Sequence, residues 1–402
     1  MTTISRAAKF AERTDRLRAS TIRELLKVTQ QPDVISFGGG LPAPELFPTR
    51  AIADCTREVM EQVGAAALQY CVTEGIQPLR EWVAERLSAR FAQPFDANDI
   101  LIVNGSQQGL DLIAKIFLDP GDHVVLAHPS YLGAIQAFDG YQARYISVET
   151  DDDGIVPAAL ERALESADPF PKFLYIVPNF QNPTGCTLSR ERREAIVRVC
   201  ERFELPIVED DPYGELRFEG EHLPALASLQ SEGCRIYCGT GSKILAPGLR
   251  IAWIATKDAD VREKIALAKQ GADLQSGSLA QYVFLQYVAK REAFEAHVAE
   301  IVRTYKHRCE VMARALEALH IDGLHFTRPK GGMFLWVTLP GIDTTELLRI
   351  SAVQKVVFVP GVSFYPNRDV HDGMRLNFSN AGDVDIETGI ARLGEAIRSM
   401  RG

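Results

Sequence analysis

Short, continuously apolar runs alternate with amphipathic stretches through the middle of the chain. The intervening stretches predict a helix that ends near residue 117 and further helices at 134–138, 158–164 and 191–202. Continuous apolar strands separated by helices are typical of a parallel sheet that helices cover on both faces. The runs predicted as strands are 100–103, 123–126, 145–148, 173–177, 206–208 and 235–238.

The two ends of the chain follow other patterns. Before the sheet, the pattern predicts a helix over 21–26, an extended Gly- and Pro-rich loop over 35–44, and helices over 48–63 and 78–91. After residue 258 the chain turns helical, and a smaller α+β part follows. Its predicted elements are a long helix over 292–319, strands at 333–337, 356–359 and 374–378, and a final helix over 385–400.

The length of 402 residues exceeds that of a usual single core, so more than one domain is expected. We predict an N-terminal segment over residues 1–47, a large domain over 48–290 and a small domain over 291–402. The ligand site is expected beyond the carboxyl ends of the parallel strands, where open α/β sheets bind ligands.

Composition narrows the class of protein. Hydrophobic residues make up 46% of the chain and charged residues 24%, as in ordinary soluble proteins. The net charge of -9 argues against a nucleic-acid or anionic-membrane partner, and no apolar run is long enough to cross a bilayer. The first residues lack the apolar core of a signal peptide. Seven widely spread cysteines favour reduced thiols in the cytoplasm, and Cys234 and Cys238 lack the further ligands of a zinc site.

One polar stretch, residues 239–250, carries the most specific chemistry. Thr240, Ser242 and Arg250 can converge on a phosphate, which a guanidinium binds through paired hydrogen bonds. Lys243 stands between small residues, and a desolvated lysine near a cation becomes a nucleophile toward carbonyls. A Schiff-base lysine beside a phosphate anchor meets the demands of pyridoxal 5′-phosphate (PLP). The alternative, an ordinary turn with a solvated lysine, would be preferred if this stretch stood alone.

Other predicted strands also end in polar segments. The first ends in Gly105-Ser106-Gln107 at the start of a helix, where free N–H groups attract anions. Each segment alone could have a purely structural role, as a helix cap, a turn or a solvated acidic pair. Together with residues 239–250, five such segments follow predicted strands in chain order, which favours a single ligand site. The remaining segments are His128-Pro129-Ser130-Tyr131, residues 178–185 and Glu209-Asp210-Asp211-Pro212-Tyr213.

Together these segments resemble the fold-type I PLP-dependent aminotransferases (class I/II) over nearly the whole chain. The motifs that carry the resemblance are Asn182-Pro183-Thr184-Gly185, Asp210-Asp211-Pro212-Tyr213, Ser242-Lys243 with Pro247-Gly248-Leu249-Arg250, and Arg375-Leu376-Asn377-Phe378-Ser379. The segments at 20–26 and 39–48 are most similar to the branch of 2-aminoadipate (LysN) and kynurenine/aminoadipate aminotransferases. The resemblance implies a large domain with a mostly parallel seven-stranded sheet, a smaller α+β domain, and an N-terminal segment that closes over the site.

The resemblance also implies a role for each site residue. Lys243 would hold PLP as a Schiff base, Asp210 would pair with the pyridine nitrogen, and Arg375 would bind the substrate α-carboxylate. Gly39 and Gly40 would let the N-terminal segment close over the substrate. The remaining implied contacts are Asn182 and Tyr213 with the phenolic oxygen, Tyr131 stacked on the ring, Ser106, Gln107, Thr240, Ser242 and Arg250 on the phosphate, Tyr70 on the phosphate of the other subunit, and Arg23 with a distal substrate carboxylate.

The activity implied is ping-pong transfer of an amino group from an L-amino acid to a 2-oxo acid, in a homodimer with shared sites. The amine of Lys243, once released, would act as the base that moves the Cα proton. 2-Aminoadipate and glutamate are the expected donors, and aromatic or branched-chain substrates are possible additions. Gly241, which stands where relatives often carry Phe, and Cys71-Val72 after Tyr70 depart from the pattern and can alter pocket shape and substrate range.

Two other functions are compatible with parts of the pattern. A PLP-dependent lyase or decarboxylase would share the same machinery and differ in the Cα bond that is broken. Aminotransferase-like domains also occur in transcription regulators, which carry an added DNA-binding domain. The roughly 30 residues before Ile35 are too short and not basic enough for such a domain.

Overall fold

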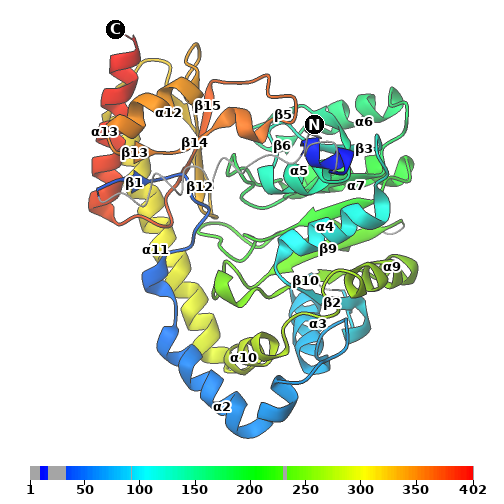
Figure 1. Cartoon of the computed structure of the whole chain (residues 1–402). Coiled ribbons are helices and arrows are strands. Elements are labelled where there is room, and N and C mark those ends of the chain that lie inside the picture. The colour runs from blue at the N-terminus through cyan, green and yellow to red at the C-terminus, as the bar shows by residue number, and fades with distance from the viewer. Residues whose placement is uncertain (1–9, 17–32, 92, 230–232, 402) are drawn as a thin grey trace, which may run out of the picture.

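A computed structural model describes residues 10–16, 33–91, 93–229 and 233–401. At its centre lies a seven-stranded sheet with the order β2-β10-β9-β8-β7-β3-β4 (Figure 1). All neighbouring strands are parallel except β10, which is antiparallel to both β2 and β9. The strands are β2 (Ile100–Val103), β3 (His123–Ala127), β4 (Arg144–Val148), β7 (Phe173–Ile176), β8 (Ile207–Asp210), β9 (Arg235–Thr240) and β10 (Ala252–Ala255).

Alternate residues of the strands enter two different cores. Val124 and Phe173 pack with α4 (Ser106–Phe117) and α5 (Leu132–Asp139). Their neighbours Val125 and Leu174 pack with α6 (Pro157–Glu165) and α7 (Arg190–Arg202) on the other face. A strand buried on both faces needs a continuous apolar run, which is why these strands show no polar alternation. The predicted parallel sheet covered by helices is confirmed.

Further helices complete the part of the molecule around this sheet. Helix α2 (Thr49–Ala67) packs against α10 (Ser278–Val288), and α3 (Gln77–Phe91) contacts α10 and β2. Helix α9 (Ala259–Gln270) lies against α4, and the short α8 (Leu226–Leu229) against β8 and β9. A small hairpin, β5 (Thr150–Asp151) and β6 (Gly154–Ile155), follows β4.

The C-terminal part contains a second sheet, which is antiparallel and has the order β11-β12-β15-β14. Helices α11 (Arg291–Ala318), α12 (Thr344–Val353) and α13 (Asp383–Arg401) pack with it (Figure 1). β1 (Ile35–Ser36) pairs in parallel with β13 (Val356–Val357), so an N-terminal segment is joined to the C-terminal part. The strands of the second sheet are β11 (His325–Phe326), β12 (Phe334–Thr338), β14 (Val359–Pro360) and β15 (Gly373–Asn377).

The structure differs from the sequence-based expectation in two places. Strand β10 lies directly after Arg250, and none of the predicted apolar runs includes it. The run 356–359, expected as one strand, is divided between β13 and β14, which belong to different sheets. The predicted helix over 21–26 lies outside the described residues. Short 3₁₀ turns occur at Glu12–Arg16, Pro44–Leu46, Ala97–Asp99, Pro247–Leu249 and Gly361–Phe364.

The boundaries 1–47, 48–290 and 291–402 stay a prediction. Within the described residues, no helix is both long and apolar enough to cross a membrane.

Candidate active site

The site lies where the carboxyl ends of the parallel strands meet the second sheet. Lys243 follows β9, and its Nζ donates a hydrogen bond of 2.9 Å to the carbonyl oxygen of Gly40. Burial lowers the pKa of this amine to about 8, and the cations of Arg375 and Arg250 act in the same direction. An amine with a pKa of about 8 is neutral in roughly a tenth of the molecules at pH 7, far more than an ordinary lysine, and the neutral form is the one that acts as a nucleophile or base.

Asp210 ends β8 and is 2% exposed. Its Oδ2 accepts a hydrogen bond of 2.8 Å from the hydroxyl of Tyr175, while its Oδ1 has no partner among the described residues. Burial raises the pKa of this carboxyl to about 7; the Tyr175 hydrogen bond lowers it and the negative charge of Asp211 raises it. A buried hydrogen-bond acceptor without a partner destabilises the protein unless a ligand donates a hydrogen bond to it.

Arg375 projects from β15 of the second sheet and is fully buried. Its Nη1 donates to Asn182 Oδ1 at 2.9 Å, and its Nη2 donates to the carbonyl oxygen of Gly38 at 2.7 Å. The guanidinium carbon lies 4.3 Å from the ring centre of Phe334. Burial lowers the pKa of Arg375 to about 10. The guanidinium therefore holds a main-chain oxygen where a substrate carboxylate can bind.

Asn182 links this arginine to the next side chain in the site. Its Nδ2 donates to the hydroxyl of Tyr213 at 3.4 Å. Burial raises the pKa of both Tyr213 and Tyr131. The charges of Asp210 and Arg375 act on both phenols, which places Tyr131 in the same site.

A second group of polar side chains surrounds the start of α4. The hydroxyls of Thr240 and Ser242 lie 3.0 Å apart, and Arg250 Nη2 donates to the carbonyl oxygen of Asn104 at 3.1 Å. Ser106 Oγ is buried without a partner among the described residues. A Cβ at Gly105, whose φ is +83°, would lie 2.1 Å from Arg250 Nη2, so only glycine fits there. Gln107, by contrast, donates to the carbonyl oxygen of Gly133 at 2.8 Å.

Tyr70, a predicted site residue, does not lie among these side chains. Tyr70 is 77% exposed and lies on the outer surface of the chain. Arg23 lies outside the described residues. Gly39 and Gly40 do lie at the site, because Gly40 is bound by Lys243 and the carbonyl oxygen of Gly39 accepts from Asn377 Nδ2 at 2.5 Å.

Residues that the sequence did not reveal also shape the site. Tyr175 lies within an apolar strand, and only its position near the carboxyl end of that strand could have marked it as a site residue.

Gly241 faces the core rather than the Lys243 amine, because a Cβ there would lie 2.4 Å from Phe284. Phe284 packs against Trp82 at a ring distance of 5.8 Å and so occupies the space. The expectation that Gly241 reshapes the substrate pocket therefore finds no support in this geometry.

Comparisons with known proteins identify the family of the chain. Residues 33–393 match the family "Aminotransferase class I and II". The chain is 43% identical to aromatic-amino-acid aminotransferase 1 of Thermococcus litoralis, over 97% of this chain and 94% of the relative. The crystal structure of Pyrococcus horikoshii kynurenine aminotransferase, in complex with PMP, superposes with a TM-score of 0.94 at 42% identity and covers 99% of both chains.

A third similar protein is LysN, the α-aminoadipate aminotransferase of Thermus thermophilus. Its structure, complexed with N-(5′-phosphopyridoxyl)-L-leucine, gives a TM-score of 0.91 at 38% identity and covers 98% of both chains. The fold and these relatives thus define a fold-type I PLP-dependent enzyme. The chain belongs to the class I and II aminotransferases, and its activity is amino-group transfer.

The side chains present fit the cofactor. Asp210 Oδ1 and Ser106 Oγ are the buried, unpartnered atoms on which the pyridine nitrogen and the phosphate would make hydrogen bonds. The Lys243 amine, with its lowered pKa, lies in the same site. Bound PLP would therefore complete polar groups that the described part of the chain leaves unsatisfied.

Proposed function

We propose that this aminotransferase moves the amino group of 2-aminoadipate or glutamate to a 2-oxo acid and also accepts aromatic or branched-chain amino acids. The observation that carries the binding of an amino acid is that Lys243 and Arg375, from different parts of the fold, both contact the backbone segment of residues 38–40. Lys243 Nζ binds the Gly40 carbonyl and Arg375 Nη2 binds the Gly38 carbonyl. A bound amino acid needs an amine-handling group and a carboxylate-binding group at this close spacing.

We assign the cofactor contacts to the residues around Lys243. PLP, when bound, supplies the electron sink for loss of the Cα proton. Asp210 keeps the ring nitrogen protonated, while Asn182 and Tyr213 bind the phenolic oxygen and Tyr131 covers the ring. The phosphate is held by Ser106, Gln107, Thr240, Ser242 and Arg250.

Arg375 and Lys243 act on the substrate. Arg375 exchanges the Gly38 oxygen for the substrate α-carboxylate, which accepts a bidentate pair of hydrogen bonds. Lys243, whose amine has a pKa of about 8, would take the proton from the substrate Cα and pass it to the aldehyde carbon of bound PLP. Closure of Gly39 and Gly40 over the substrate excludes water from this step.

The proposed substrate range rests on the relatives and on Arg23. Similar proteins are described as acting on aromatic amino acids, kynurenine and α-aminoadipate. Arg23 is the candidate for pairing with the distal carboxylate of a dicarboxylic substrate, since Arg375 binds the carboxylate that all amino acids share. Apolar side chains carry no second charge, so their binding does not depend on this arginine.

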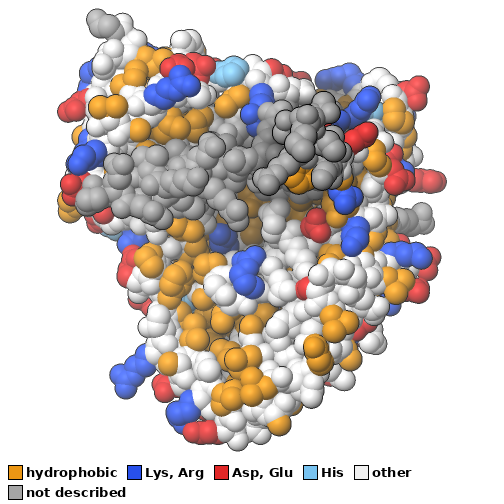
Figure 2. All heavy atoms as spheres, viewed as in Figure 1, with side chains coloured by type: hydrophobic (Ala, Val, Ile, Leu, Met, Phe, Trp, Pro, Cys, Tyr) orange, Lys and Arg blue, Asp and Glu red, His pale blue; other side chains and the backbone are white. Residues whose placement is uncertain are grey.

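We further propose a homodimer in which Tyr70 reaches the phosphate of the other subunit. Tyr70 is exposed together with several apolar side chains of the second half of α2 and of the loop after it. Figure 2 shows hydrophobic side chains over the lower part of this face, where α2 lies in Figure 1. Exposed apolar patches of this kind mark interaction surfaces. The patch comprises Met60, Val63, Leu68, Tyr70 and Val72. A cytoplasmic location stays a prediction from the number and spread of the cysteines.

A half-reaction screen tests the substrate proposal. The PLP-loaded protein is mixed with single amino acids, and loss of the visible absorbance of the bound cofactor is followed together with formation of pyridoxamine phosphate. We expect rapid reaction with 2-aminoadipate and glutamate and slower reaction with leucine and phenylalanine. Turnover of apolar amino acids without reaction of either dicarboxylic one would contradict the proposal. The Lys243→Ala variant is the control.

A further inference from the structure

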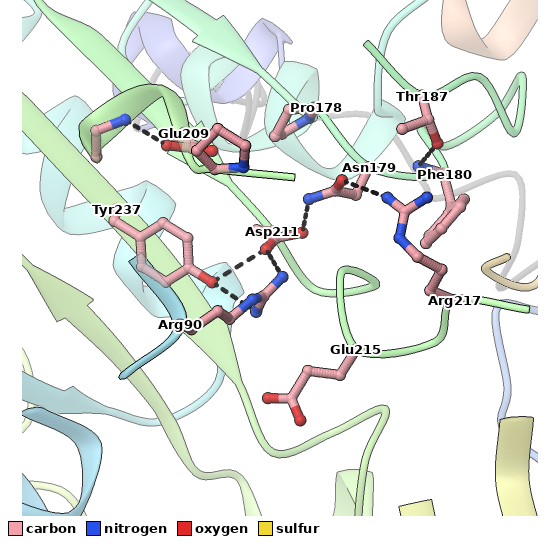
Figure 3. Close-up of polar contacts among 12 residues, drawn as sticks. Arg90, Pro178, Asn179, Phe180, Thr187, Glu209, Asp211, Glu215, Arg217 and Tyr237 are labelled. Atoms are coloured by element: carbon pink, nitrogen blue, oxygen red, sulfur yellow. Dashed lines mark hydrogen bonds and ion pairs between the residues drawn. The ribbon is translucent and has the colours of Figure 1, made fainter. Parts of the chain in front are cut away.

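A second layer of polar and charged side chains, joined by hydrogen bonds and an ion pair, is formed by residues other than those assigned to the cofactor (Figure 3). Its centre is Asp211, which is 5% exposed and directly follows Asp210. Asp211 Oδ2 accepts hydrogen bonds from Arg90 Nη2 at 2.7 Å and from the Tyr237 hydroxyl at 3.1 Å. Asp211 Oδ1 accepts from Asn179 Nδ2 at 2.9 Å. One carboxylate therefore joins helix α3, strand β9 and the loop after β7.

Asn179 extends the layer to helix α7. Its Oδ1 accepts from Arg193 Nη2 at 2.6 Å and from Arg217 Nη2 at 3.3 Å. Arg193 is fully buried, and its remaining N–H groups donate to the carbonyl oxygens of Leu188, Pro224 and Pro178. The position of Asn179 is thus fixed from two sides, by Asp211 and by an anchored arginine.

The layer is close in sequence to the cofactor-facing residues. Asp211 lies between Asp210 and Tyr213, and Asn179 is on the same loop as Asn182. Gly214, directly after Tyr213, leaves room for the layer: a Cβ there would lie 2.0 Å from Arg90 Nη2 and 2.4 Å from Asp211 Oδ2. Any larger residue at Gly214 would force the ion pair apart.

Asp210, Asp211 and Arg193 are buried and the Arg90 side chain is only 15% exposed, so the balance of charge around Asp211 matters for Asp210. The negative charge of Asp211 raises the pKa of Asp210, and Arg90 supplies the compensating positive charge at hydrogen-bond distance. A buried charge that loses its partner is strongly destabilising. The titratable and charged groups that face Asp211 or its partners are Arg90, Arg193, Glu209, Asp210, Glu215, Arg217, His222 and Tyr237.

We propose that Arg90 and Asp211 are positioning residues of the transamination site, whose ion pair, joined through Asn179, fixes the two loops that carry Asp210, Tyr213 and Asn182 against the cofactor ring. The proposal rests on the cofactor contacts proposed above. Neither residue touches the cofactor or the substrate; both act through the loops. Arg90 belongs to α3, 121 positions away from Asp211, so the pair also ties this helix to the site.

The test uses the purified full-length protein without substrate. The variants are Arg90→Met, Arg90→Lys and the double variant Arg90→Met/Asp211→Asn. The matched control is Arg262→Met, which removes the partly buried contact of Arg262 with Asp99 at the opposite end of the sheet. The measurements are the PLP dissociation constant, the pH midpoint of the visible absorbance of the bound cofactor, and the melting temperature.

For Arg90→Met we expect PLP affinity to fall about tenfold or more and the midpoint to rise by about 0.5 pH units or more. The midpoint is expected to rise because Tyr213 and Asp210, once displaced, would no longer favour the deprotonated form of the linkage between Lys243 and the cofactor. Arg90→Lys retains the charge but not the fork geometry, and gives intermediate values. The Arg262→Met control loses thermal stability only.

The double variant separates positioning from charge compensation. It restores the charge balance without restoring the ion pair, so the midpoint stays high if positioning is the cause. Return of the double variant to the wild-type midpoint would overturn the proposal, as would identical behaviour of Arg90→Met and Arg262→Met. Failure of the substrate proposal would leave all these cofactor measurements unchanged, because no amino acid is present.

Discussion

The hydroxyl of Tyr175 donates a hydrogen bond of 2.8 Å to Oδ2 of Asp210, and both groups are buried at the carboxyl ends of neighbouring strands. The hydrogen bond favours the ionised carboxylate that burial disfavours. Tyr175 thereby leaves Oδ1 of Asp210 as the free oxygen for the cofactor nitrogen.

Removing this hydroxyl should weaken cofactor binding. A hydrogen bond to a charged group contributes about 1.5–3 kcal/mol, so Tyr175→Phe is expected to weaken PLP binding roughly tenfold or more. Fluorescence titration of the cofactor-free protein measures the effect. Tyr145→Phe is the matched control, because Tyr145 also donates to a carboxylate, that of Asp139, but away from the site. Equal affinities of the two variants would contradict the role of Tyr175.

The raised pKa of Asp210 predicts a pH-dependent stability of the cofactor-free protein. The folded state takes up a proton between pH 3.8 and about 7, so the contribution of Asp210 to the free energy of unfolding falls as pH rises through this window. A rise from 3.8 to about 7 corresponds to about 4 kcal/mol at most. Asp210→Asn should therefore be more stable than wild type at about pH 8, with the difference shrinking toward about pH 4. Burial also raises the pKa of Glu209 to about 7, but Glu209 is present in both proteins, so its contribution cancels in the difference between their free energies of unfolding.

Urea unfolding of both cofactor-free proteins at several pH values measures this difference. Parallel stability curves for wild type and Asp210→Asn would show that the carboxyl group is ionised throughout.

Lys243 is expected to be the single site of covalent cofactor attachment. Borohydride reduction of the PLP-loaded protein should remove its yellow colour and add the cofactor mass to the peptide that contains Lys243. Lys243→Ala should form no adduct and should lose nearly all transamination, because the amine is both attachment point and base. Mass spectrometry after digestion is the measurement, and an adduct on another lysine would refute the assignment.

The shared site predicts complementation between two defective subunits. Tyr70→Phe should weaken PLP retention, because the hydroxyl exposed on one chain would reach the phosphate of the other. Mixing Tyr70→Phe with Lys243→Ala should restore part of the activity, since each mixed dimer contains one intact site. Activity is measured after subunit exchange has been verified by native mass spectrometry. No recovery in exchanged dimers would mean that Tyr70 serves its own chain.

Arg23 is predicted to discriminate among substrates. Arg23→Ala should lower kcat/KM for 2-aminoadipate and glutamate roughly ten- to a hundredfold, the effect of losing one charged contact of about 1.5–3 kcal/mol. Leucine and phenylalanine should be nearly unaffected, because they carry no distal carboxylate. Steady-state kinetics on all four substrates test the prediction, and an equal loss on each would assign Arg23 a structural role.

Sequence reasoning brings the proposed site residues together where they lie next to the ends of apolar strands. Asp210, Asn182, Lys243 and Ser106 could be found because each follows such a run, and parallel strands bring their carboxyl ends together. Arg375 required the family resemblance, since it lies inside a strand of the second sheet.

Other features could not be predicted because their partners are distant in sequence. Tyr175 and Arg90 form their hydrogen bonds with Asp210 and Asp211 only after α3, β7 and β8 have packed together. Nothing in the local pattern around Arg90 separates it from a solvated helix arginine. Strand β10, which the sequence analysis missed, is short and closely follows a turn. The pattern of apolar and polar residues therefore does not mark where the strand begins.

The reversed direction of β10 has a mechanical consequence. Because β10 runs antiparallel to β9, with Ala252 opposite Thr240, the loop between them leaves and re-enters the sheet at the same end of these two strands. The backbone N–H of Gly241 also donates to the carbonyl oxygen of Ile251 at 3.0 Å. Lys243 and Arg250 thus sit on one short loop clamped at its base, and a shift of the surrounding helices would carry them as a unit. The proposed reactive amine and the proposed phosphate anchor would therefore keep their spacing if the second sheet moved relative to the first.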